Sequence, residues 1–144
     1  MHILIVDDKP KFRVQPTIYF LKEKNVDFTY KIVNSVNSAL QYIDEHLNEI
    51  DLAIIDLGLP HFDNDRKYSE LNGLLVIEHL LEKTIDIPII INSEKRVVKE
   101  KSCLKPYIKQ GAVIQHLNFL SGEWLIEFLK KIWQNYRINK KLVR

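Results

Sequence analysis

Short apolar segments alternate with helical patterns along the whole chain, and this alternation restricts the fold more than any other feature. Strand-like apolar segments occur at residues 2–6, 28–33, 52–56, 87–92 and 112–117. Apolar residues spaced three and four apart, as in helices, follow at residues 16–24, 36–47, 74–83, 94–107 and 123–138. Segments such as ILIV and LAII are apolar throughout, which is typical of parallel strands buried on both faces. We therefore expect an α/β fold, a doubly wound five-stranded parallel sheet with helices on both faces.

Two places interrupt this pattern. Pro16 lies where a helix starting near Lys11 would already need backbone hydrogen bonds, so the first helix should begin late or be kinked. The connection from Gly58 to Gly73 is much longer than the usual strand-to-helix link, and we interpret it as an insertion loop that is either functional or mobile. With 144 residues, the chain is expected to form a single domain over residues 1–144.

Composition excludes several classes of protein. Cys103 is the only cysteine, so no internal disulfide can form, and a reducing cytoplasmic setting is expected. No apolar run approaches the roughly 20 residues of a membrane helix, and no secretory leader is recognisable. The four glycines do not form the G-x-G-x-x-G turn of a dinucleotide site. We expect no membrane partner.

The charge is unevenly distributed. Residues 130–144 contain six basic residues and no acidic one, whereas the rest of the chain is mildly acidic. Such a basic C-terminal helix could contact phosphate backbones. We prefer the interpretation of a solvated last helix whose cations favour the helix dipole. We expect no nucleic-acid partner.

Three carboxylates follow two of the predicted strands. Asp7 and Asp8 end the first strand, and Asp56 ends the third. In open α/β sheets, ligands bind at the carboxyl ends of the strands, where these side chains would crowd together and repel one another. Hard oxygen ligands of this kind suit Mg²⁺ better than zinc. The pattern is compatible with a magnesium site or with acidic residues that merely face a loop.

Several motifs together resemble the receiver domain of two-component response regulators. These are ILIVDD, DLAIIDLGLP, Gly73 at the start of a helix, PIIINS, and the Gly111-Ala112 pair. The resemblance extends over nearly the whole chain and implies a flavodoxin-like fold with strand order 2-1-3-4-5. It also implies that Asp56 accepts a phosphoryl group and that Asp7, Asp8, Asp56 and the backbone carbonyl of Gly58 hold Mg²⁺. Ser93 matches the hydroxyl residue that contacts the phosphoryl group and signals its arrival.

The sequence departs from the family at one important position. Receiver domains carry a lysine after the fifth strand, and here Asn118 lies at or near that position, followed by Phe119. Glu94 occupies a position that is usually small. Asparagine can donate a hydrogen bond but supplies no positive charge. Two hypotheses follow: a receiver phosphorylated on Asp56, or a pseudo-receiver that binds partner proteins without phosphorylation.

The resemblance also implies partners. The phosphoryl donor would be a histidine kinase or a phosphotransfer protein, and the output would pass to a downstream protein. A homodimer through the face formed by the fourth and fifth helices is a further expectation. Any enzymatic activity would be limited to self-phosphorylation and autodephosphorylation of Asp56.

Overall fold

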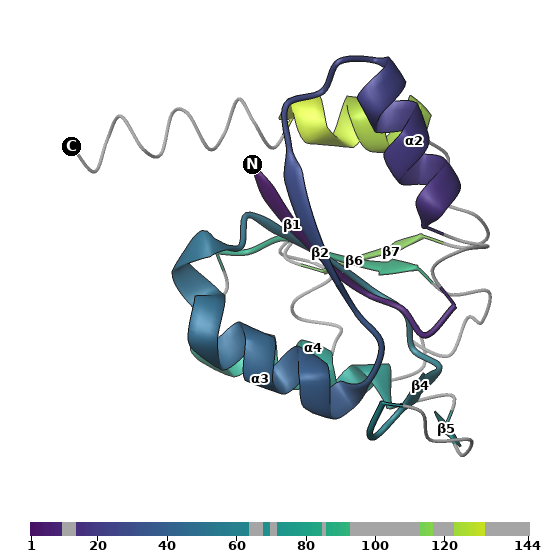
Figure 1. Cartoon of the computed structure of the whole chain (residues 1–144). Helices are drawn as coiled ribbons and strands as arrows, with labels where there is room; N and C mark the ends of the chain where they lie inside the picture. The colour runs from purple at the N-terminus through teal and green to yellow at the C-terminus, as the bar shows by residue number, and fades with distance from the viewer. Residues whose placement is uncertain are drawn as a thin grey trace.

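A parallel five-stranded sheet forms the centre of the molecule (Figure 1). The computed structural model describes residues 1–9, 14–63, 68–69, 72–84, 86–92, 113–116 and 123–131. The strands are β1 (His2–Val6), β2 (Thr29–Val33), β3 (Leu52–Ile55), β6 (Ile89–Asn92) and β7 (Val113–His116). Their order in the sheet is β2-β1-β3-β6-β7, and every neighbouring pair is parallel. In chain order this is 2-1-3-4-5, so the predicted fold class and strand order are confirmed.

Helices cover both faces of this sheet, as predicted (Figure 1). The helices are α2 (Gln15–Glu23), α3 (Val36–His46), α4 (Gly73–Lys83) and a helix at residues 123–131, with a short 3₁₀ turn η1 (Leu47–Glu49) after α3. The helix predicted at residues 94–107 lies outside the described residues.

Alternation along the strands divides the core into two layers. Leu4 and Val6 of β1 pack with α3 and α4, whereas Ile3 and Ile5 pack with α2 and the helix at residues 123–131. Each of these four side chains is almost completely buried. Successive strand residues point to opposite faces, so a strand that is apolar at every position supplies both layers.

Local sequence signals explain where the helices begin and end. Pro16 lies in the first turn of α2, where a missing N–H costs nothing, so the helix starts late as expected. Asn25 follows the end of α2 with φ of 56°, the left-handed conformation that asparagine tolerates well. Ser35 caps α3, because its Oγ accepts a 3.2 Å hydrogen bond from the backbone N–H of Ser38.

The connection between β3 and α4 contains a small sheet of its own. Strands β4 (Leu59–Pro60) and β5 (Tyr68–Ser69) pair antiparallel inside the stretch from Gly58 to Gly73, which we expected to be a loop. Leu59 is fully buried, so the beginning of this insertion packs into the core. The insertion therefore has regular structure where it leaves β3.

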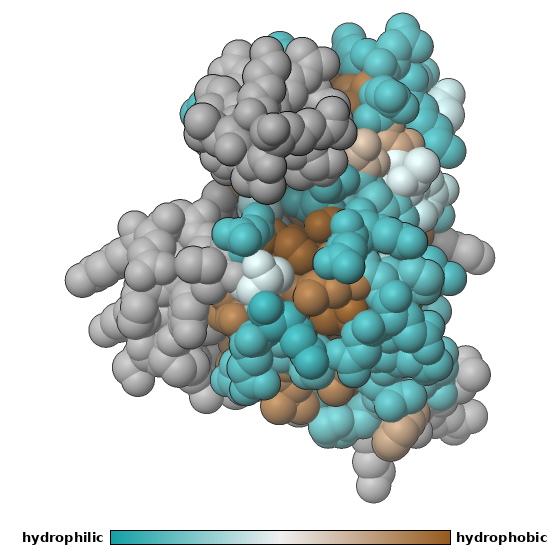
Figure 2. Space-filling model, turned by 90° about the vertical axis from the view of Figure 1, so that its left-hand side faces the viewer, coloured by the Kyte–Doolittle hydropathy of each residue, from teal (hydrophilic) through white to brown (hydrophobic). Residues whose placement is uncertain are grey.

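Figure 2 shows the side of the molecule that lies at the left of Figure 1, near the N-terminus. Among the described residues there, hydrophilic side chains surround a small hollow lined by hydrophobic ones. Within the described part of the chain, no helix has both the length and the hydropathy needed to cross a bilayer.

Candidate functional site

The register of the central strands places the acidic residues side by side. Val6 of β1 lies opposite Ile55 of β3, so Asp7 and Asp56 follow at equivalent positions on neighbouring strands. The ladder continues one residue further, because the Asp56 N–H donates to the Val6 carbonyl at 2.9 Å. The Asp7 N–H likewise donates to the Val33 carbonyl of β2 at 3.0 Å. Both backbone positions are thus held by the sheet itself rather than by a loop.

The carboxylates of Asp7, Asp8 and Asp56 form one cluster. Each offers an oxygen, and these oxygens all lie within 4.8 Å of one another. Asp7 and Asp56 are only 2% and 3% exposed, whereas Asp8 is partly exposed. The Lys9 N–H donates to Asp7 Oδ1 at 2.8 Å, and the Gly58 N–H donates to Asp56 Oδ1 at 3.4 Å. The cluster that the sequence predicts is therefore present, partly buried and oriented by backbone amides.

Helix α4 approaches the acidic segment very closely at Gly73. The Gly73 N–H donates to the Leu57 carbonyl at 2.8 Å. A Cβ at this position would lie 2.6 Å from Leu57 Cα and would also collide with the carbonyl oxygen of Asp56. Only glycine permits this approach, because backbone atoms on the opposing side cannot rotate away. The start of α4 is therefore fixed directly against the residues that follow β3.

Two further side chains anchor the insertion. Buried Asn72 donates from Nδ2 to the Leu59 carbonyl at 2.7 Å. The hydroxyls of Ser35 and Ser38 donate to Asp63 Oδ1 at 2.6 and 2.8 Å. These two hydrogen bonds lower the pKa of Asp63 from its ordinary value of 3.8. The insertion is thus tied to the start of α3 as well as to the start of α4.

Not every predicted site residue falls within the described part of the chain. Four of them lie outside the described residues, and their roles remain predictions: Ser93, Glu94, Asn118 and Phe119. The Gly58 carbonyl, predicted as a metal ligand, belongs to the turn whose N–H contacts Asp56.

Sequence reasoning missed the anchors Asn72 and Asp63. The Ser35–Asp63 hydrogen bond joins residues 28 positions apart, and the Asn72–Leu59 bond joins residues 13 apart. Such separations leave no periodic signal in a single sequence. Serine is a common N-cap residue, so Ser35 carries a local signal for the start of α3, but that signal does not identify a tertiary partner.

Comparison with known proteins finds similar solved structures but no similar sequence among family models or curated proteins. No protein-family model matches the sequence, and no curated protein sequence is similar to it. Among solved structures, a two-component transcriptional regulator AraC from Clostridium phytofermentans matches with a TM-score of 0.69 at 17% identity, covering 99% of this chain and 98% of that one. The chain has the receiver-domain fold.

Two other receiver structures support the same assignment. A CheY-like response regulator receiver domain protein from Methanospirillum hungatei gives a TM-score of 0.67 at 17% identity, with 94% and 96% of the two chains covered. The response regulator TrrA from Thermotoga maritima, solved in complex with Mg²⁺-BeF, gives 0.58 at 20% identity, with 91% and 97% covered. In this receiver fold, the acidic cluster lies at the carboxyl edge of β1 and β3, where open α/β sheets bind ligands.

Proposed function

We propose that this chain is a response-regulator receiver domain that accepts a phosphoryl group on Asp56 and signals through a surface change. The single observation that supports this most strongly is the cluster of Asp7, Asp8 and Asp56, whose oxygens lie within 4.8 Å of one another. Three carboxylates that meet at the ends of two adjacent strands supply the oxygen ligands that suit binding of a cation.

The donor set fits Mg²⁺. Three carboxylates would supply hard oxygen ligands, few enough to leave room for water and substrate oxygens. Asp7, Asp8, Asp56 and the Gly58 carbonyl are the residues proposed to hold it. When bound, the cation neutralises part of the charge that gathers when a phosphoryl anion meets a carboxylate.

The residues of the chain contribute positioning and the nucleophile. An Asp56 oxygen attacks the phosphorus of an acyl phosphate or a phosphohistidine, forming a new O–P bond. The bond from phosphorus to the donor breaks, and its electron pair leaves with the donor's carboxylate or imidazole. The sheet bond from the Asp56 N–H fixes its backbone, and the Gly58 N–H holds Oδ1, so little reorganisation is needed.

The remaining roles extend this proposal. Ser93 contacts the incoming phosphoryl group, and Asn118 takes the place of the usual lysine with a neutral donor. The donor is a histidine kinase or a phosphotransfer protein, and a downstream protein, a second copy included, receives the signal within a cytoplasmic two-component system. Residues 1–144 act as one domain, with the insertion and the basic C-terminal segment as additions.

A second candidate is a pseudo-receiver that binds partners without phosphorylation. It is favoured by Asn118, which cannot supply the positive charge that lysine offers to the phosphoryl oxygens. In this case the acidic cluster would still bind Mg²⁺, but Asp56 would not be modified.

Intact mass measurement separates the two candidates. The chain is incubated with Mg²⁺ and either acetyl phosphate or phosphoramidate, which mimics a phosphohistidine, beside the variants Asp56→Asn and Asp51→Asn. We expect one phosphoryl adduct on the wild type and on Asp51→Asn, none on Asp56→Asn, and loss of the adduct when Mg²⁺ is chelated. No adduct on the wild type with either donor would contradict the proposal and leave the pseudo-receiver.

A further inference from the structure

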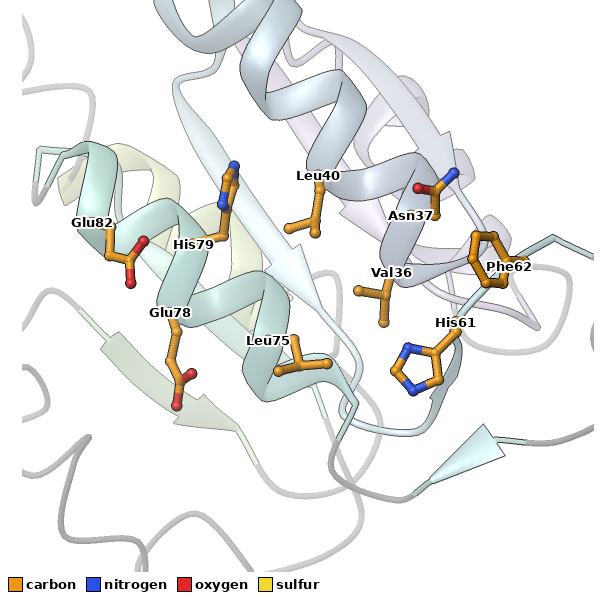
Figure 3. Close-up of a pocket in the computed structure, with 9 residues that line it drawn as sticks. All are labelled: Val36, Asn37, Leu40, His61, Phe62, Leu75, Glu78, His79 and Glu82. Carbon is orange, nitrogen blue, oxygen red and sulfur yellow. The ribbon is translucent and has the colours of Figure 1, made fainter.

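A groove lies between α3 and α4, and none of its lining residues belongs to the acidic cluster (Figure 3). It has a volume of about 360 Å³. Val36 and Leu40 of α3 and Leu75 of α4 line it, and Phe62 from the insertion closes one end (Figure 3). The groove is therefore built by three segments that are distant in the sequence.

Its apolar lining is unusually exposed. Phe62 is 59% exposed and Leu75 is 43% exposed, and among the described residues Tyr19 is the only other large hydrophobic residue with comparable exposure. Exposed apolar residues that gather in one concave place mark interaction sites more often than isolated ones do. Two of the three most exposed hydrophobic residues in the described chain thus meet in this groove.

The wall that carries Phe62 is anchored on both sides. The carbonyl of His61 accepts a 2.9 Å hydrogen bond from the Asn37 N–H. Asp63 accepts hydrogen bonds from the Ser35 and Ser38 hydroxyls at 2.6 and 2.8 Å. Phe62 lies between these two anchors in the sequence, so the backbone on both sides of this exposed side chain is held in place. A wall of this kind is ordered before binding, which lowers the entropic cost of binding.

The rim of the groove carries negative charge. Glu78 and Glu82 follow one another by one turn along α4 (Figure 3). Within the described residues, neither forms an ion pair, whereas the neighbouring His79 and Lys83 are both engaged by Asp44 at 2.7 and 3.8 Å. The groove therefore combines an apolar floor with two carboxylates that form no ion pair with any residue that the structure describes.

The chain itself contains a segment of matching chemistry. Residues 130–144 contain six basic residues and no acidic one, and Ile132, Trp133 and Tyr136 add apolar side chains at helical spacing. We propose that the groove between α3 and α4 binds residues 130–144 of a second copy of this chain. The apolar side chains would contact Phe62 and Leu75, and the cations would pair with Glu78 and Glu82.

A second copy fits better than the chain's own terminus. The helix at residues 123–131 packs on the face of the sheet opposite to α3 and α4. To reach the groove, residues 130–144 of the same molecule would have to pass around a layer of helices and the edge of the sheet, each about 10 Å thick, whereas a second copy meets the groove from outside. This inference does not depend on phosphorylation of Asp56. The groove also differs from the dimer face that the family resemblance implies, because that face is formed by the helices predicted at residues 94–107 and 123–138.

Sedimentation velocity over a range of concentrations tests the inference. The variants are Glu78→Lys with Glu82→Lys, and a matched control, Glu23→Lys with Asp27→Lys, which changes the net charge equally at exposed sites on α2 and after it. We expect concentration-dependent association of the wild type and the control, weakened by salt. The groove variant should associate at least about tenfold more weakly than the wild type, because like charges would face each other.

A peptide of residues 130–144 gives a second readout. Labelled at its N-terminus and titrated with the full chain, it should bind the wild type and the control, and Phe62→Ala should weaken its binding on the order of tenfold. Circular dichroism melting confirms that each variant folds. A wild type that stays monomeric throughout, or equal association of the groove variant and the control, would overturn the inference.

Discussion

The two ends of the same parallel strands differ sharply in chemistry. At the amino end, polar groups meet complementary partners: the His2 N–H donates to Asp51 Oδ2 at 2.7 Å, and the His2 ring bonds Thr29 Oγ1 and Tyr42 Oη at 2.7 and 2.6 Å. At the carboxyl end, three carboxylates gather within 4.8 Å. The amino end therefore holds a hydrogen-bonded polar network, whereas the carboxyl end brings together three acidic side chains whose oxygens can serve as ligands for a cation.

The amino-end network extends onto α3. The Tyr42 ring stacks on His46 with centroids 4.5 Å apart, and His46 Nδ1 lies 2.9 Å from Glu49 Oε2. Burial, and to a lesser degree the charge of Glu49, raise the pKa of Tyr42 above its ordinary value of 10.0. The phenol is thus kept neutral, as a hydrogen-bonding structural group should be.

The largest effect on stability is expected at the carboxyl end, from Gly73→Ala. The added Cβ would collide with the backbone of Asp56 and Leu57, so α4 would have to move away from the acidic segment. We expect a loss of about 3 kcal/mol in the free energy of unfolding, measured by urea titration. Leu75→Ala on the same helix, at a 43% exposed position, is the control and should change stability by less than about 1 kcal/mol. Equal, small effects would show that α4 is not fixed against this segment.

A smaller effect is expected at the amino end, from Tyr42→Phe. The substitution removes the hydroxyl that bonds His2 Nε2 at 2.6 Å while keeping the ring that stacks on His46. We expect a loss of about 1 kcal/mol, the usual contribution of one hydrogen bond, by the same titration. Phosphoryl adduct formation should not change. A variant that folds normally but loses the adduct would show that the two ends are coupled.

The sequence predicts the fold and the acidic cluster well, because both depend on local patterns. Short apolar runs that alternate with helical patterns indicated the strands. Because Asp7 and Asp56 come at or directly after the ends of two of these runs, their proximity could also be predicted. Pro16 likewise indicated that α2 begins late.

The predictions were less complete for the insertion. We expected a loop from Gly58 to Gly73. Strands β4 and β5 have only two residues each, which is too short for a recognisable strand pattern, and their pairing joins residues about nine positions apart. The Asp63 and Asn72 anchors, and the exposure of Phe62 beside Leu75, likewise arise only after the chain has folded.

The smallest expected effect concerns pH and the anchor at Asp63. Because hydrogen bonds from Ser35 and Ser38 lower the Asp63 pKa, they contribute stability above its ordinary value of 3.8, and that contribution is lost as pH falls through the lower folded-state pKa. We expect Asp63→Asn to melt slightly below the wild type at pH 7 and to approach it as the pH falls below about 4. Melting curves between pH 7 and 3 measure this. A difference that stays constant across the range would contradict the assigned hydrogen bonds.

Melting with and without Mg²⁺ tests the central contrast between the two ends most directly. Mg²⁺ should raise the melting temperature of the wild type and of Asp51→Asn, an amino-end control. The added free energy of unfolding should approach about 2.7 kcal/mol at a hundredfold excess of Mg²⁺ over Kd. Asp8→Asn should show no such rise, and without Mg²⁺ it should be more stable than the wild type by about 1 kcal/mol, because one like charge is gone. Identical wild-type curves with and without Mg²⁺, or an undiminished rise in Asp8→Asn, would contradict a cation site at Asp7, Asp8 and Asp56.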